Sequence, residues 1–103
     1  MVKGYDHNFV IDNCDGNINK VAEVTCPGSG RKMSVYTDLP AIQFYAGNCI
    51  APVEGKGGTT YGPRTGLCLE TQFSPDTANK PEWPSSVFGP ERDYKTTTIY
   101  KFN

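Results

Sequence analysis

Short alternations of apolar and polar residues, with a period of two, dominate the chain. No window carries apolar residues at the i, i+3, i+4 and i+7 spacing of an amphipathic helix, and the alternating runs are bounded by Gly, Pro, Asn or Asp. This pattern predicts an all-β chain. The expected strands are residues 7–12, 20–26, 32–38, 41–46, 59–61, 67–73 and 94–102.

Turn-forming residues separate these runs and predict how they are connected. The segments 13–17 (Asn-Cys-Asp-Gly-Asn) and 27–30 (Pro-Gly-Ser-Gly) are typical of tight hairpin turns, so an antiparallel meander is expected. Segment 54–58 (Glu-Gly-Lys-Gly-Gly) predicts a flexible loop. Four prolines in residues 75–90 lack the N–H of a central strand, which predicts an irregular excursion held to the core by Trp83 and Phe88.

One expected strand carries a carboxylate among apolar neighbours. In residues 66–73 (Gly-Leu-Cys-Leu-Glu-Thr-Gln-Phe), alternation places Cys68, Glu70 and Gln72 on one face and the remaining strand residues on the other. A carboxylate at that position contacts either water or a ligand. From the pattern alone, a solvated residue on the open face of an antiparallel sheet is the simpler interpretation.

Length and charge exclude several classes of protein. The length of 103 residues predicts a single β-domain over residues 1–103. With 10 Lys plus Arg and 11 Asp plus Glu, the formal net charge is -1. No block of like charges marks a surface for nucleic acid or an anionic membrane. No apolar stretch approaches the roughly 20 residues that span a bilayer. The N-terminus has no signal-peptide pattern, so a soluble, cytoplasmic chain is expected.

Four cysteines and a single histidine limit the available chemistry. The four cysteines include no C-x-x-C pair, which predicts reduced thiols rather than two disulfide bridges, and no metal site. His7 would have to serve as the base in any Ser-His-Asp or Cys-His arrangement, so such schemes are disfavoured.

Three stretches occur together in the order typical of one enzyme family. They are Gly4-Tyr-Asp-His-Asn-Phe9, Thr37-Asp-Leu-Pro-Ala-Ile-Gln-Phe-Tyr-Ala-Gly-Asn48 and Gly66-Leu-Cys-Leu-Glu-Thr-Gln72. With Ser29-Gly-Arg31, Pro75-Asp-Thr-Ala-Asn79 and the closing run 94–102, the chain resembles the aldose 1-epimerases, or galactose mutarotases, over essentially its whole length. The resemblance implies the C-terminal third of a large antiparallel β-sandwich. In that family the earlier part supplies an Asn-Arg pair and two histidines, one of them the proposed general acid.

The resemblance also implies roles for three residues. Glu70 matches the catalytic base, and Asp6 and Gln43 match residues that bind sugar hydroxyls. Exchange of anomers needs a base and an acid at the anomeric centre, without metal or cofactor. Glutamate, whose ordinary pKa is about 4.3, is ionised near neutral pH and accepts a proton. Without the resemblance, Asp6 is interpreted as a turn residue and Gln43 as an outward-facing polar residue. Alternation places the His7 side chain on the other side of the backbone from Asp6. His7 is therefore expected to be a structural hydrogen-bonding residue.

The expected function is interconversion of the α and β anomers of free hexoses such as galactose or glucose. The motifs contain no Lys or Arg cluster for a phosphorylated sugar. The alternatives are a non-catalytic carbohydrate-binding β-domain that keeps Asp6 and Gln43, and a structural β-domain without a ligand. Part of a sandwich exposes unpaired strand edges, so we expect self-association or pairing with a complementary N-terminal chain.

Overall fold

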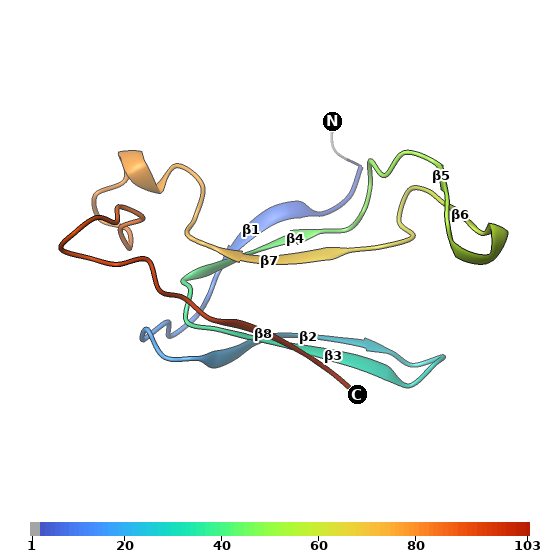
Figure 1. The fold of residues 1–103 in the computed structure, drawn as a ribbon, viewed down its shortest axis with the longest axis horizontal. Helices are drawn as coiled ribbons and strands as arrows, with labels where there is room; N and C mark the ends of the chain where they lie inside the picture. Colours follow the sequence, from blue (N-terminus) through green and yellow to red (C-terminus); the bar gives the residue numbers. More distant parts are fainter. Residues whose placement is uncertain (1–2) are drawn as a thin grey trace.

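Two three-stranded antiparallel sheets face each other in the computed structural model, which describes residues 3–103 (Figure 1). The first sheet has the order β1 (Asp6–Val10), β4 (Ala41–Tyr45), β7 (Cys68–Gln72), and the second has the order β2 (Asn19–Cys26), β3 (Arg31–Thr37), β8 (Thr98–Phe102). A small hairpin of β5 (Val53–Glu54) and β6 (Thr60–Tyr61) extends from the first sheet. The described residues contain no α-helix, only the 3-10 turns Lys56–Gly58 and Thr77–Asn79. The predicted all-β antiparallel sandwich is confirmed.

The hairpin between β2 and β3 forms where the sequence predicts it. The Cys26 carbonyl accepts the N–H groups of Ser29 (3.2 Å) and Gly30 (2.8 Å), and Gly30 has a φ of 69°. This positive φ favours glycine because it has no Cβ. The two strands then pair from Cys26 opposite Arg31 up to the start of β2.

The predicted hairpin between β1 and β2 is wrong. These strands lie in different sheets, and residues 11–18 carry the chain from one layer to the other (Figure 1). The eight residues are too many for a tight hairpin turn. The Asp15 carboxylate instead accepts the N–H of Asn17 (2.9 Å) and the side-chain amide of Asn19 (2.8 Å). The hydrogen bonds from Asn17, followed by that from Asn19, lower the pKa of Asp15.

The boundaries of the shorter elements differ from prediction. Strand β5 was not predicted, because two residues leave no periodic pattern. The expected loop at 54–58 is the end and turn of that hairpin, with Gly57 and Gly58 at positive φ. Strand β8 begins at Thr98 rather than at residue 94, and the Asp38 carboxylate takes the N–H of Thr97 instead (3.0 and 3.2 Å). The C-terminus is tied to β3, since Asn103 and Lys32 exchange backbone hydrogen bonds.

Residues 75–90 form the predicted irregular excursion. Phe88 packs edge-on against the half-buried Phe73 (5.6 Å between ring centroids) and the exposed Tyr94 (4.9 Å), outside the buried core. Trp83 was also expected to anchor the segment to the core, but its side chain is 39% exposed and lies at the rim of a surface pocket.

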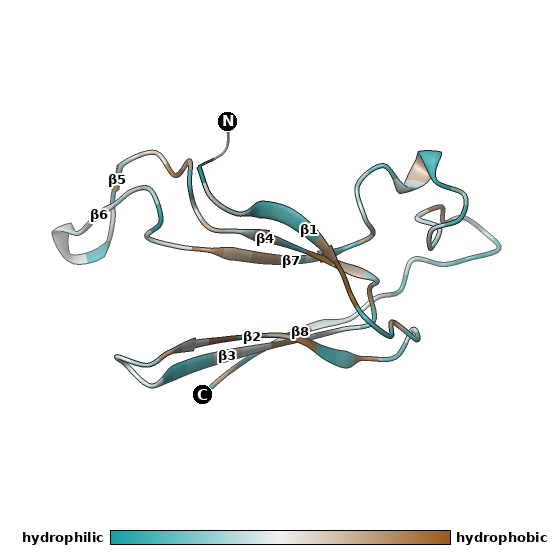
Figure 2. Ribbon diagram, turned by 180° about the vertical axis from the view of Figure 1, so that it is seen from behind, coloured by the Kyte–Doolittle hydropathy of each residue, from teal (hydrophilic) through white to brown (hydrophobic). Residues whose placement is uncertain are grey.

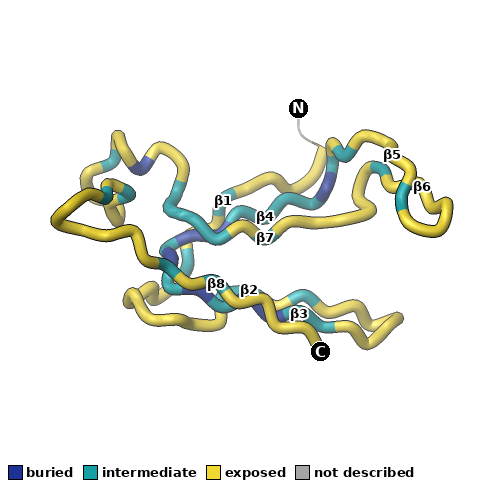
Figure 3. The backbone as a smooth tube through the Cα atoms, in the orientation of Figure 1, coloured by how far each residue is buried: buried dark blue, intermediate teal, exposed yellow. Residues whose placement is uncertain are grey.

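The buried core is small and lies where β3 leads into β4. Its apolar members are Val35, Leu39, Ala41 and Ile42. Figure 3 shows buried segments where the chain passes from β3 to β4. Figure 2 shows hydrophobic positions distributed along strands of both layers. The radius of gyration is 16.4 Å, whereas a compact chain of about 100 residues has a radius near 13 Å. The two sheets therefore enclose little of their facing surfaces.

Candidate active site

The first sheet has one apolar and one polar face, because side chains alternate along its strands. The apolar face lines a cavity of about 370 Å³ together with residues of β2, so it is the inner face of the sandwich. Its members are Phe9, Ile42, Phe44 and Leu69. The opposite, outer face carries the residues that the sequence singles out.

Strand register brings Asp6, Gln43 and Glu70 to this outer face from three different strands. Gln43 in the central strand β4 lies directly opposite Glu70 of β7. On its other side, the neighbouring strand β1 places Asn8 opposite Gln43, with Asp6 one step away on the same face. Directly opposite residues have Cβ atoms about 4.5–5.5 Å apart. The three predicted site residues therefore form one cluster, although the sequence separates them by tens of residues.

Asp6 and Gln43 are joined by a hydrogen bond. The Gln43 Nε2 donates to Asp6 Oδ1 at 2.8 Å, with Gln43 half-buried and Asp6 exposed. Side-chain hydrogen bonds between residues 37 positions apart require both strands to be in register. The pair presents carboxylate and amide oxygens and N–H groups to solvent, which is the chemistry that binds sugar hydroxyls.

Glu70 is the free carboxylate of the cluster. It is exposed, and no hydrogen bond or ion pair to its side chain occurs within residues 3–103. A carboxylate without an internal partner keeps its lone pairs available for an external proton.

Two amides on the same face, Gln72 and Asn8, were not assigned a role from the sequence. Gln72 Nε2 donates to Gln43 Oε1 (3.2 Å) and to Asn8 Oδ1 (2.9 Å), and Asn8 Nδ2 donates to Ser74 Oγ (3.0 Å). The sequence signal that could have identified Gln72 is alternation, which places it on the same face of its strand as Glu70. The contact to Asn8, 64 residues away, depends on strand order and could not be inferred.

His7 lies on the opposite side of the backbone from Asp6, as alternation predicts. Its Nδ1 accepts the backbone N–H of Asp6 at 3.0 Å, and its ring packs edge-on against Tyr5 (5.6 Å between centroids). This is the structural hydrogen-bonding role that the sequence indicated. His7 does not join the cluster on the outer face.

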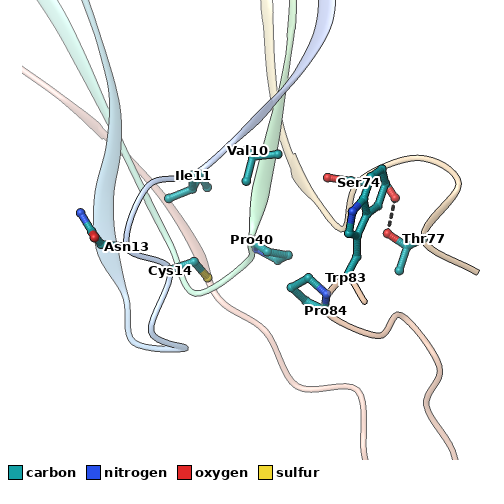
Figure 4. A pocket seen from close by; sticks show the side chains of 9 residues that line it. All are labelled: Val10, Ile11, Asn13, Cys14, Pro40, Ser74, Thr77, Trp83 and Pro84. Atoms are coloured by element: carbon teal, nitrogen blue, oxygen red, sulfur yellow. Dashed lines mark hydrogen bonds between the residues drawn. The ribbon is translucent and has the colours of Figure 1, made fainter. Parts of the chain in front are cut away.

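Tyr45 and Trp83 are aromatic side chains of the first sheet and its adjoining loop, with faces of the kind that stack on sugar rings. Tyr45 is half-buried, and its hydroxyl accepts the N–H of Cys49 at 2.8 Å. Trp83 lines a mostly apolar pocket of about 340 Å³ at the end of the first sheet, beside Pro84 and Pro40 (Figure 4). Ser74 belongs both to this pocket and to the chain of amide hydrogen bonds, so the pocket adjoins the outer face.

Other features of the chain give no competing site. Both ion pairs of the described part involve Glu23, in the second sheet, and all four cysteines are free and exposed. In residues 3–103 no group of three or more His, Cys, Asp or Glu side chains could hold a metal ion. No helix in the same range is long and apolar enough to cross a membrane.

Comparison with known proteins gives one consistent family. A family model described as aldose 1-epimerase matches residues 1–101. Galactose mutarotase from Mus musculus is 40% identical over 103 residues, and the human galactose mutarotase is 40% identical over 105; each comparison covers 99% of this chain and 30% of the relative. Aldose 1-epimerase from Escherichia coli strain K12 is 37% identical, covering 98% of this chain and 30% of the relative. The chain thus spans about 30% of the length of these relatives. It belongs to the aldose 1-epimerase family.

Proposed function

We propose that this chain carries the base and part of the sugar site of a mutarotase, an enzyme that interconverts the α and β anomers of a free hexose such as galactose. The observation that carries the proposal is the grouping of Glu70, Gln43 and Asp6 on one face of three paired strands. The relatives named galactose mutarotase and aldose 1-epimerase support it.

Glu70 is the proposed base. Its carboxylate takes the proton of the C1 hydroxyl while an acid protonates the ring oxygen; the C1–O5 bond breaks and the sugar opens to an aldehyde. C1 then rotates, and the same proton transfers in reverse close the ring on the other face. The cyclic hemiacetal and the open aldehyde have the same oxidation level and only protons are transferred, so these steps need no redox cofactor. A well-placed acid or base contributes typically about 10²- to 10⁴-fold in rate.

Asp6 and Gln43 are the proposed sugar ligands. Asp6 Oδ1 is already occupied by the Gln43 amide, which leaves Asp6 Oδ2 to accept a ring hydroxyl. Gln43 keeps one N–H for donation to a sugar oxygen. These contacts orient the ring so that its C1 hydroxyl lies against the Glu70 carboxylate. The motifs contain no Lys or Arg cluster for a phosphate group, which favours a free sugar.

The acid is the missing partner of this site. His7, the single histidine, lies on the other face of its strand, and the family resemblance assigns the acid to a histidine from an earlier part of the protein. The 103-residue chain by itself is therefore expected to be slower by the roughly 10²- to 10⁴-fold that one acid-base partner supplies.

We further propose that the chain associates with a complementary N-terminal chain or with itself. The open cavity between the sheets, the extended radius of gyration and exposed apolar side chains such as Phe9 (46%) and Phe102 (73%) support this. Strands β1, β7, β2 and β8 each leave one edge unpaired in the two sheets. Light scattering tests this proposal: a sharp monomer with cooperative unfolding contradicts it.

A carbohydrate-binding module without turnover is the second candidate function, favoured by the exposed, acid-free cluster. Polarimetry of freshly dissolved α-galactose, run beside a galactose titration of the same sample, separates the two. Faster approach to the equilibrium rotation supports the mutarotase, whereas binding without acceleration supports the module. The absence of any sugar binding supports a structural β-domain.

A further inference from the structure

The Gln72 side chain joins three strands at the proposed sugar site without a role in the chemistry described above. Its amide donates to Gln43 Oε1 at 3.2 Å and to Asn8 Oδ1 at 2.9 Å, and the residue is half-buried. We infer that Gln72 is a positioning residue that fixes the orientation of the Gln43 amide and thereby keeps Asp6 Oδ2 directed at the sugar. The inference rests on the proposed function.

The direction of each hydrogen bond in this cluster is determined by Asp6. An ionised carboxylate only accepts hydrogen bonds, so the Gln43 amide must present Nε2 to Asp6 and its oxygen to the other side. The group that meets this oxygen must therefore be a donor, and Gln72 supplies it. The same Gln72 nitrogen donates to Asn8, whose own nitrogen donates to Ser74 Oγ at 3.0 Å. Hydrogen bonds are thus donated outward from Gln72 along two branches, through Asn8 to Ser74 and through Gln43 to Asp6.

The hydrogen bond from Gln72 to the Gln43 side-chain oxygen has no substitute in the described part of the chain. Within residues 3–103, Gln43 Oε1 accepts a hydrogen bond from Gln72 alone. If this donor is removed, the Gln43 amide keeps its bond to Asp6 but is free to sample other rotamers about its terminal bonds. The sugar must then restrict that motion on binding, so affinity falls while the proton transfer at Glu70 is left in place.

The Gln72→Glu variant is the sharpest perturbation. Glutamate conserves the length and shape of the glutamine side chain. When ionised, it has no N–H donor and presents a carboxylate oxygen to the two acceptors, Gln43 Oε1 and Asn8 Oδ1. We expect galactose affinity to fall about 3- to 10-fold, the range of one neutral hydrogen bond. The matched control is Asn19→Asp, because Asn19 Nδ2 also donates to two acceptors, Asp15 Oδ1 and the Asn17 carbonyl, but in the other sheet. That variant should leave affinity unchanged.

A double-mutant cycle distinguishes positioning from general destabilisation. If Gln72 acts through Gln43, Gln72→Leu should weaken galactose binding in the otherwise unchanged chain but add less than about 1.5-fold once Gln43→Ala is present. Additive effects of the two substitutions overturn the inference.

A second readout needs no sugar. We expect ¹⁵N relaxation to report the Gln43 side-chain amide as ordered in the unchanged chain and in Asn19→Asp, and as mobile in Gln72→Glu and Gln72→Leu. Equal order of this amide in all four proteins contradicts the positioning role. Failure of the base assignment would appear elsewhere, as unchanged mutarotation after Glu70→Gln, so the two proposals are tested separately.

Discussion

Thr37 holds together the point where the chain passes from the second sheet into the first. Its side chain is buried, and its Oγ1 accepts the N–H of Leu39 at 3.2 Å. The same hydroxyl lies 3.1 Å from the Thr97 carbonyl and 3.2 Å from Thr98 Oγ1. The Thr98 hydroxyl in turn forms a hydrogen bond with the hydroxyl of Thr71 in β7, with 2.5 Å between the two Oγ1 atoms. This cluster fixes the start of β4, the strand that carries Gln43.

Thr37→Val conserves the shape of the side chain and removes the hydroxyl. The main loss is the partner of the buried Leu39 N–H, since an unsatisfied buried donor costs about 1–3 kcal/mol. Thr97 is exposed, so water replaces the partner of its carbonyl at little cost. We therefore expect the free energy of unfolding to fall by about 2 kcal/mol. The control Thr37→Ser keeps the hydroxyl and removes one methyl group, which costs about 1 kcal/mol.

Urea unfolding followed by circular dichroism measures both variants. Small proteins have slopes of about 1–3 kcal/mol per molar urea, so near the lower end of that range a loss of about 2 kcal/mol lowers the midpoint by roughly 1.5–2 M. The order of the two variants decides the argument. If Thr37→Ser is destabilised more than Thr37→Val, packing rather than hydrogen bonding holds this junction, and the reasoning is refuted.

Two further predictions concern other parts of the fold. Hydrogen bonds from Lys20 and then Lys32 lower the pKa of Glu23 from 4.5 to about 2, so the stability that Glu23 contributes is present above pH 4.5 and is lost as the pH falls towards 2. A carboxyl NMR titration checks the pKa, and the difference in stability between the unchanged chain and Glu23→Gln should vanish over that window; a midpoint near 4.5 contradicts this. Gly47 has a φ of 71° and a Cβ there would lie 2.3 Å from the Gly66 carbonyl oxygen, whereas Gly57 has a φ of 65° and open space. Urea unfolding should show a loss of about 1 kcal/mol for Gly57→Ala and a clearly larger one for Gly47→Ala, and equal losses contradict the steric argument.

The face of the sheet that carries the candidate site could be predicted from the sequence because it depends on local alternation. Glu70 belongs to a strand with a clear period of two, and the motif around Gln43 has the same property. Both strands lie close to their predicted positions. In each, a one-residue slip would move the polar side chain to the inner face, so the apolar residues of the strand fix its orientation.

Strand partners could not be predicted in the same way. The turn residues of segment 13–17 indicate a change of direction, but they do not specify whether the next strand pairs with β1 or lies in the other sheet. The partner of β1 is β4, which follows about 30 residues later and pairs through contacts that local propensity does not encode. The Gln72 contacts depend on this order. The late start of β8 has a similar cause, because β-propensity at 94–97 does not supply a neighbouring strand.

The most direct test of the central claim is the rate of mutarotation after Glu70→Gln, measured by polarimetry in a form of the protein that also contains the acid-bearing segment of the family. Glutamine conserves the size of the side chain and its place opposite Gln43 but cannot accept the C1 proton as a carboxylate does. We predict a loss of about 10²- to 10⁴-fold in rate, with galactose affinity changed little. An unchanged rate would contradict the assignment of Glu70 as the base.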